Sequence, residues 1–413
     1  MFQRVIWNRI LTSLPRSYRL RHINKFSSDV TKDENNTSKL VNAEVSSTDD
    51  FESTCNTEHV SYLLEESTTF KDAKDKSWAT TPFPKDVSTK QMGDRPFVNP
   101  EDTSVIMFPG QGTIKVGMVN NYMKFPAAKE LFEIANEILN YDLLDICLNG
   151  PQEKLDRTEF NQAATVVLSL AALEKLREER PTAFDNCMAT LGYSVGEITS
   201  LILSGVISFE DGIRLVCVRG KAMQYASERV PQGMLSVNCT PSAKIANSCQ
   251  EAEKWAMEMG VDNPVCRVAI YLCTQRKILA GNIEALRYIE SNKREMGLTD
   301  VTRLPVSGAF HTPLMEPCLK SVFKMLSSIE LDEPRCLVYS NYKTTPYNNL
   351  RLVKKYILKQ IVSPVKWEQC LQKVYEREPG RTFPMTYDVG SGGRMKTILR
   401  MVNAKAWQSC IVI

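Results

Sequence analysis

The feature that most constrains the fold is the segment Gly192-Tyr193-Ser194-Val195-Gly196, a G-x-S-x-G sequence. A short apolar segment precedes it and a helix-compatible segment follows. In this context the motif predicts a sharp turn from strand to helix that exposes the serine hydroxyl. Glycines flank the turn because a Cβ on either side would collide with it. The pattern also occurs in purely structural glycine-rich turns, so alone it leaves both interpretations open.

Predicted strands and helices alternate around this motif, as in an α/β sheet protein. The part of the chain that we expect to fold begins with an apolar strand, which ends at Pro109-Gly110. Ser208 with Asp211 resembles a capping box that opens a helix running past Arg219. The further elements expected in this part are strands at 104–108, 187–191, 337–340 and 382–388, helices at 126–139, 162–178 and 313–328, two helices between 340 and 382, and a last helix after 388.

Between 230 and 304 the order of the predicted elements changes to β-α-β-β-α-β, which is typical of a ferredoxin-like unit. We therefore expect an α/β fold with a large subdomain at 103–229 and 305–413. A small ferredoxin-like subdomain at 230–304 is inserted into it. The elements of the insertion are strands at 234–237, 267–272, 277–280 and 301–305 and helices at 243–257 and 282–295.

The N-terminal segment 1–28 has the composition of a mitochondrial transit peptide, which implies the mitochondrial matrix. It is amphipathic and holds basic residues but no acidic ones: Arg4, Arg9, Arg16, Arg19, Arg21 and Lys25. A basic tail that binds an acidic surface is the alternative. Removal of the segment 1–28 changes the net charge of the chain from +3 to about −3. The net charge therefore does not indicate nucleic-acid binding. The polar, low-complexity segment 29–102 is expected to be disordered.

The twelve cysteines are scattered and form no CxxC motif, so we predict free thiols without structural disulfides or a zinc site. The longest apolar run, 163–173, is too short for a membrane span and predicts a buried helix.

A serine nucleophile needs a base, and the chain has only three histidines, His22, His59 and His311. Only His311 lies in the part that we expect to fold. It precedes Thr312-Pro313, which predicts the start of a helix. A structural histidine is the alternative. No carboxylate partner is evident from the sequence, so a carbonyl could orient His311 in a Ser–His dyad.

Five motifs together resemble the malonyl-CoA:acyl carrier protein transacylases, and the presequence resembles that of a mitochondrial member. The resemblance covers about 103–413, and the motifs occur in the order of that family. They are Phe108-Pro109-Gly110-Gln111-Gly112, Gly192-Tyr193-Ser194-Val195-Gly196-Glu197, Arg219-Gly220-Lys221-Ala222-Met223-Gln224, Gly308-Ala309-Phe310-His311, and Gln360 with Ser363-Pro364-Val365-Lys366-Trp367.

This resemblance implies an α/β-hydrolase-like large subdomain with a ferredoxin-like insert and a role in mitochondrial fatty acid synthesis. It implies that Ser194 takes the malonyl group from malonyl-CoA and passes it to the phosphopantetheine thiol of holo acyl carrier protein. His311 is then the base, and Gln360 supplies the carbonyl that orients it. The backbone N–H groups of Gln111 and Val195 form the oxyanion hole. No bound cofactor or metal is implied, and we expect a monomer.

Arg219 lies in a helix that is apolar on most sides, so we expect it to be buried and paired. A structural ion pair is one possibility. The resemblance implies a clamp on the malonyl carboxylate, which selects malonyl over acetyl groups. Phe310 then fills the space that a methyl branch would need, and Met223 and Asn282 are weaker pocket candidates.

The chain departs from the family pattern at Tyr193, where many relatives have histidine, and at Ser391, where many have proline. Because the acyl carrier partner is usually acidic, we expect a basic rim beside the pocket. The candidates are Lys366, Arg394, Lys396 and Arg400, which could equally form a solvated helix face.

A serine thioesterase or hydrolase would use the same nucleophile and base. A non-catalytic protein that binds acyl carrier protein is the third hypothesis.

Overall fold

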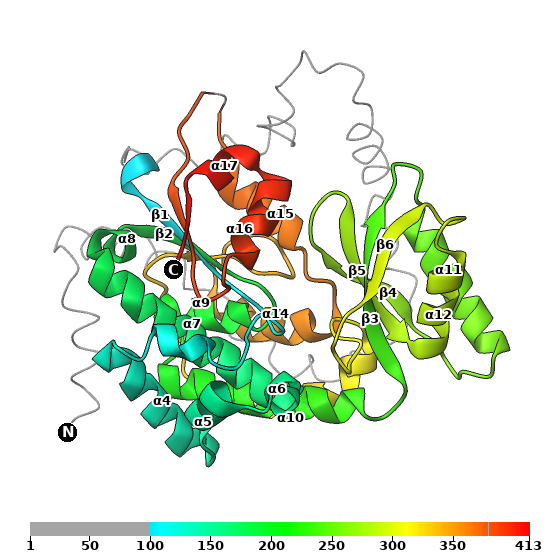
Figure 1. Cartoon of the computed structure of the whole chain (residues 1–413), viewed down its shortest axis with the longest axis horizontal. Coiled ribbons are helices and arrows are strands. Elements are labelled where there is room, and N and C mark those ends of the chain that lie inside the picture. Colours follow the sequence, from blue (N-terminus) through cyan, green and yellow to red (C-terminus); the bar gives the residue numbers. More distant parts are fainter. Residues whose placement is uncertain (1–99, 379) are drawn as a thin grey trace, which may run out of the picture. The chain divides into compact units, whose positions relative to one another are not determined.

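The computed structural model describes residues 100–378 and 380–413 (Figure 1). The predicted transit peptide at 1–28, His22, His59 and nearly all of the predicted disordered segment at 29–102 lie outside these residues. None of the helices in the described part is long and apolar enough to cross a membrane.

A five-stranded parallel sheet forms the centre of the large subdomain. Its strand order is β7 (Leu337–Val338), β2 (Cys187–Gly192), β1 (Ser104–Phe108), β8 (Met385–Asp388) and β9 (Cys410–Val412). All five residues of the central strand β1 are buried. Helices must therefore cover both faces of the sheet, and this explains why β1 is continuously apolar rather than alternating.

The helix α7 (Thr158–Glu179) is the predicted buried helix, and its whole apolar run from Ala163 to Leu173 is buried. It packs against α4 (Pro126–Leu139) and α10 (Phe209–Ser227), below the sheet in the view of Figure 1. The helices of the large subdomain are η3 (Pro100–Asp102), η4 (Met118–Asn121), α4 (Pro126–Leu139), α5 (Leu143–Asn149), α6 (Gln152–Asp156), α7 (Thr158–Glu179), α8 (Pro181–Asp185), α9 (Gly196–Leu203), α10 (Phe209–Ser227), η5 (Pro313–Cys318), α13 (Leu319–Ser328), α14 (Leu350–Val362), α15 (Trp367–Tyr375), α16 (Arg394–Val402) and α17 (Ala404–Gln408).

The second sheet is antiparallel, with the strand order β4-β5-β3-β6. Its elements are β3 (Gln232–Cys239), α11 (Ile245–Glu258), β4 (Cys266–Tyr271), β5 (Arg276–Asn282), α12 (Ile283–Asn292) and β6 (Leu298–Arg303). The helices α11 and α12 lie side by side on this sheet and share a separate apolar core with it (Figure 1). The predicted α/β fold with an inserted small ferredoxin-like unit is confirmed.

Several element boundaries differ from the prediction. The helix expected at 313–328 is a 3-10 helix up to Cys318 and becomes an α-helix only afterwards. Pro317 explains this, because its missing N–H and its ring disfavour a regular α-helical turn. The strand expected from Thr382 begins at Met385, and the pattern did not indicate β9.

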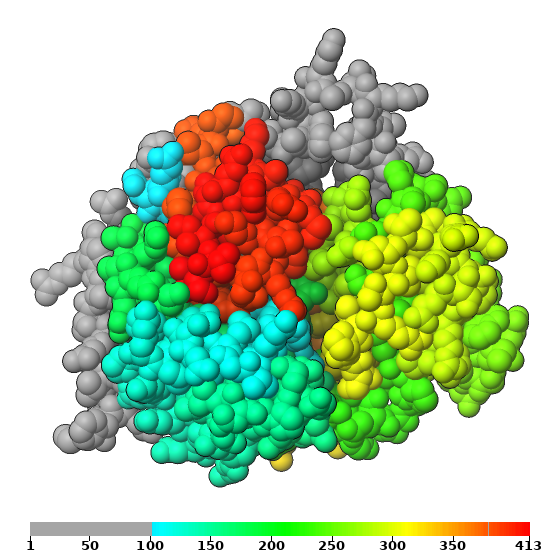
Figure 2. Space-filling model, in the orientation of Figure 1, coloured from blue at the N-terminus to red at the C-terminus, as the bar shows by residue number. Residues whose placement is uncertain are grey.

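The two sheets are joined close to the segment that follows α14. Tyr271 N donates to Val365 O and Val365 N donates to Ala269 O, both at 2.9 Å. A buried ion pair, Lys277 with Glu368 at 3.8 Å, links β5 to α15. Figure 2 shows a recess where the surfaces of the C-terminal residues (red) and of the first described residues (cyan) meet that of the small subdomain (yellow).

Candidate active site

The G-x-S-x-G motif forms the predicted turn at the end of β2, immediately before α9. Ser194 has a φ of 55°, a left-handed conformation that costs about 1–3 kcal/mol for a residue other than glycine. A Cβ at Gly192 would overlap the backbone of Gly196, and one at Gly196 would overlap Pro109. The turn is therefore compact, and it holds the serine at the carboxyl edge of the sheet.

Ser194 faces the single histidine of the described chain. Its Oγ lies 2.7 Å from His311 Nε2, and His311 Nδ1 lies 2.7 Å from the backbone oxygen of Gln360. A carbonyl can only accept, so Nδ1 carries the ring proton and Nε2 is free to accept the proton of Ser194. The structure thus brings together Ser194, His311 and Gln360 as a relay that contains no carboxylate.

The sequence explains why the Gln360 carbonyl is available. Gln360 lies in the last turn of α14, so its carbonyl would normally accept from the residue four positions later. That residue is Pro364, which has no N–H. The oxygen therefore lacks its helical partner and accepts from His311 instead.

Burial and, to a smaller extent, the neighbouring charge of Arg219 lower the pKa of His311 to about 3, although the hydrogen bond to the Gln360 carbonyl opposes this shift. The side chain is only 2% exposed. His311 is therefore neutral at physiological pH, which is the state that a general base requires.

Gln111 and Val195 lie on the two loops that approach each other beside Ser194. A Cβ at Gly110 would overlap Tyr193, so the loop before Gln111 lies directly against the elbow. Gly112 on the same loop donates to Asn161 Oδ1 at 3.1 Å. Across the described residues, the N–H groups of Gln111 and Val195 have no hydrogen-bond acceptor. They are therefore available to an oxyanion.

Arg219 is 1% exposed and lies in α10. Its Nη1 donates to Gln162 Oε1 at 2.6 Å, its Nη2 donates to Gln360 Oε1 at 3.0 Å, and its Nε is buried without a partner. Burial lowers the pKa of Arg219 to about 10, so it remains a cation at neutral pH. In the described part of the chain no carboxylate forms a salt bridge with it, and the structural ion pair considered from the sequence is therefore absent there.

Phe310 and the two weaker pocket candidates, Met223 and Asn282, differ in their surroundings. Phe310 is buried beside Gly308, and Met223 is buried with its sulfur 3.4 Å from Gln162 Nε2. Phe310 directly precedes His311 in the chain, and Met223 contacts Gln162, which also accepts from Arg219. Asn282 lies at the end of β5, where its side chain accepts from Val265 N at 2.8 Å. No described contact joins it to Ser194 or His311.

Three polar residues of the site were not predicted as functional: Glu197, Asn341 and Gln162. Asn341 Oδ1 accepts from Ser194 N at 2.8 Å, and Glu197 Oε2 accepts from Gln360 Nε2 at 2.8 Å. The sequence marks Glu197 only by its place in the elbow motif, and the partners that this fully buried carboxylate needs lie far away along the chain. Nothing local in the sequence marks Asn341.

Tyr193 and Ser391, the two departures from the family pattern, both make contacts within the described structure. Tyr193 packs edge-on against Trp367, with a centroid distance of 5.4 Å. Ser391 Oγ accepts from Met395 N at 3.1 Å and so caps the first turn of α16. Ser391 therefore stabilises the start of α16.

The four rim candidates lie close to the site loops or on α16. Arg394 is exposed, and its Nη1 donates to Gly112 O at 2.5 Å. Lys396 and Arg400 lie over the ring of Trp407, at 5.9 and 5.8 Å from its centroid. Lys366 is half-buried, and its backbone N–H donates to Asn341 O.

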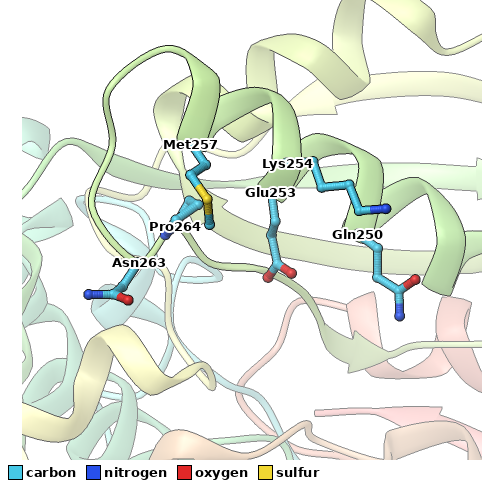
Figure 3. A pocket seen from close by; sticks show the side chains of 6 residues that line it. All are labelled: Gln250, Glu253, Lys254, Met257, Asn263 and Pro264. Atoms are coloured by element: carbon cyan, nitrogen blue, oxygen red, sulfur yellow. The ribbon is translucent and has the colours of Figure 1, made fainter.

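A surface hollow of about 380 Å³ lies elsewhere, on α11 and the loop that follows it (Figure 3). Its lining residues are Gln250, Glu253, Lys254, Met257, Asn263 and Pro264. None of them takes part in the hydrogen bonds around Ser194, so the chemistry of the site, and not this hollow, defines the candidate active site.

Comparison with known proteins identifies relatives along most of the described chain. Residues 105–383 match the family model described as acyl transferase domain. The Drosophila melanogaster protein named probable malonyl-CoA-acyl carrier protein transacylase, mitochondrial, is 46% identical over 315 residues, which are 76% of this chain and 83% of that protein. The human mitochondrial malonyl-CoA-acyl carrier protein transacylase is 43% identical over 310 residues, 75% of this chain and 80% of that protein.

A solved structure, the malonyl CoA-acyl carrier protein transacylase of Coxiella burnetii, is 26% identical. It superimposes with a TM-score of 0.67 and covers 77% of this chain and 95% of its own. The likeness therefore extends over both sheets.

Proposed function

Since the chain belongs to the malonyl-CoA-acyl carrier protein transacylases, within the acyl transferase domain family, we propose how its residues carry out malonyl transfer. The substrates are malonyl-CoA and the phosphopantetheine thiol of holo acyl carrier protein. The observation that carries the proposal is a Ser194–His311 pair beside Arg219, a buried cation whose hydrogen-bond acceptors in the described chain are the amide oxygens of Gln162 and Gln360.

In the first half-reaction, Ser194 Oγ attacks the thioester carbonyl of malonyl-CoA while His311 Nε2 takes its proton. The backbone N–H groups of Gln111 and Val195 receive the developing oxyanion, and each such donor typically contributes about 3 kcal/mol. The carbon–sulfur bond then breaks, and His311 returns the proton to the coenzyme A sulfur. The malonyl group is now an ester of Ser194.

In the second half-reaction, the carrier thiol gives its proton to His311 and attacks the malonyl-serine ester. Collapse of the tetrahedral intermediate forms malonyl-carrier thioester, and His311 returns the proton to Ser194. Because burial keeps His311 neutral, it can accept a proton in each half-reaction.

Arg219 gives the site its preference for a diacid. The carboxylate of malonyl-CoA pairs with the guanidinium, whose Nε is buried without an acceptor. An acetyl group has no carboxylate to pair with the guanidinium. The free-energy cost of this unpaired buried cation makes the site select malonyl-CoA strongly over acetyl-CoA. Phe310 and Met223 line the same region and limit the size of the acyl group. Asn282 would act through the backbone that it supports.

We place this reaction in the mitochondrial matrix because residues 1–28 contain six basic and no acidic residues. The mitochondrial names of the Drosophila and human relatives support the organelle.

Transfer can be measured directly. The full chain is incubated with malonyl-CoA and holo acyl carrier protein, and malonyl-carrier protein and free malonate are quantified by mass spectrometry. We expect malonyl-carrier protein as the main product and none with Ser194→Ala. Free malonate as the main product would instead identify a thioesterase. If neither product forms, the result would favour the third hypothesis, a non-catalytic protein that binds acyl carrier protein.

A further inference from the structure

Glu197 is a buried carboxylate that the mechanism above does not use. It lies in the first turn of α9, three residues after the nucleophile, and has no exposed surface. Tyr347 donates its hydroxyl to Oε1, while Gln360 Nε2 and Asn341 N donate to Oε2 at 2.8 and 3.1 Å. These three donors come from the segment after β7 and from α14, both far from α9 in the sequence.

Two of these donor residues, Gln360 and Asn341, also form hydrogen bonds with the backbone of the nucleophile turn. Gln360 Nε2 also donates to Ser194 O at 2.9 Å. Asn341 Oδ1 accepts from Ser194 N, and Asn341 Nδ2 donates to Gly192 O, both at 2.8 Å. In the described structure, every hydrogen bond between the Ser194 backbone and a side chain thus involves a residue that also donates to Glu197.

Gln360 also contributes to the other two functional side chains. Its backbone oxygen orients His311, and its side-chain oxygen accepts from Arg219. A displacement of Gln360 would therefore disturb the serine, the base and the cation together. A left-handed residue such as Ser194 keeps its conformation only when its surroundings determine it, and the two amides supply that determination.

We propose that Glu197 is a positioning residue for malonyl transfer: by holding Gln360 and Asn341 it fixes the backbone of Ser194 and the orientation of His311. The ionised carboxylate is the effective form, because a charged acceptor makes stronger hydrogen bonds to both amides than a neutral one. This inference rests on the proposed function.

The electrostatic surroundings make the effect dependent on pH. Burial raises the pKa of Glu197 to about 7, while the hydrogen bonds from Tyr347, Gln360 and Asn341 and the charge of Arg219 oppose this rise. Cys370 on α15 also interacts electrostatically with Glu197, and its own pKa is well above the usual range. Because His311 remains neutral, we expect Glu197 to determine how Ser194 acylation depends on pH near neutrality.

The test compares Glu197→Gln and Glu197→Ala with the wild-type chain and with Glu174→Gln. Glu174 is a matched control, since it is a largely buried carboxylate with a raised pKa that pairs with Arg177 on α7. The rate constant of Ser194 acylation is measured by rapid quench with malonyl-CoA from pH 6 to pH 8.5. The melting temperature and the KM for malonyl-CoA are recorded for each variant.

In the wild-type chain and in Glu174→Gln, we expect the acylation rate constant to rise as the pH increases through about 7. Glu197→Gln keeps an acceptor oxygen and the shape of the side chain but lacks the charge. Its rate should be about tenfold lower at pH 8 and independent of pH around neutrality. Glu197→Ala should lose about 10²-fold, because misplacement by about 1 Å has an effect of this size.

The inference is overturned if folded Glu197→Gln keeps the wild-type rate and pH profile. It is also overturned if both Glu197 variants lose activity only in proportion to the fraction of unfolded protein. If the wild-type chain forms no malonyl-serine at all, the proposed function fails instead, so the two failures are distinguishable.

Discussion

Replacing Arg219 with alanine tests the electrostatic origin of substrate selection. The guanidinium is 1% exposed, and two amide oxygens accept from it without neutralising its charge. A malonyl carboxylate bound to it forms a desolvated ion pair. Removal of one partner from a buried pair costs about 3–5 kcal/mol, and about 1.4 kcal/mol corresponds to a factor of ten. We therefore expect kcat/KM for malonyl-CoA to fall by about 10²- to 10⁴-fold.

The same substitution should change the preference between donors. Acetyl-CoA leaves the buried cation unpaired in the wild-type site, so Arg219→Ala removes that penalty, and the malonyl-to-acetyl ratio of kcat/KM should collapse towards one. The assay measures acyl transfer to holo acyl carrier protein from each donor at several concentrations. Arg219→Lys keeps the charge but lacks the planar two-donor geometry, so it should fall between the wild type and Arg219→Ala.

Arg214→Ala provides the control, because Arg214 lies on the same helix but is half-exposed and pairs with Asp211. It should leave both donors unaffected, since exposed ion pairs contribute little. If folded Arg219→Ala retains malonyl-CoA activity within about threefold of the wild type, or if its donor ratio is unchanged, the argument from the buried guanidinium is refuted.

The remaining predictions concern folding and stability. Gly192→Ala would place a Cβ inside the backbone of Gly196, so the chain should be recovered as insoluble protein or with a much lower melting temperature; a normal melting curve would contradict this. The lowered pKa of His311 contributes stability that is present above pH 6.5 and is lost as the pH falls towards 3. Urea unfolding should therefore show a steeper loss of stability from pH 6.5 to 4.5 in the wild type than in His311→Gln, and equal slopes would count against a neutral buried histidine. Lys277→Met leaves Glu368 buried without its ion-pair partner and should cost about 3 kcal/mol, whereas the double change Lys277→Met/Glu368→Leu should regain part of that loss in a denaturant titration.

The order of the elements could be predicted because most of them carry a local signal. The capping box at Ser208 is an example, since its side chain accepts from Asp211 N as expected. The β-α-β-β-α-β order between the two parts of the large subdomain was also evident from periodicity alone. In contrast, β9 is only three residues long and pairs solely with β8, so its existence depends on a neighbour that no local pattern identifies.

The candidate site divides in the same way. Ser194, His311 and Arg219 could be singled out because a motif, a count of histidines and an apolar helix indicated them. Asn341 and Glu197 could not, because their partners lie far away in the sequence: Asn341 holds Ser194 across 147 residues. Sequence patterns describe neighbours within a few turns of the chain, whereas a hydrogen-bond network depends on the complete fold.

In the proposed mechanism, Ser194 carries the malonyl group between two thiols. The most direct test is intact-mass analysis of the full chain after a brief incubation with malonyl-CoA, followed by peptide mapping and then by addition of holo acyl carrier protein. We expect one malonyl adduct on Ser194 that disappears as malonyl-carrier protein forms. An adduct on another residue, or transfer to the carrier protein in the Ser194→Ala variant, would contradict it.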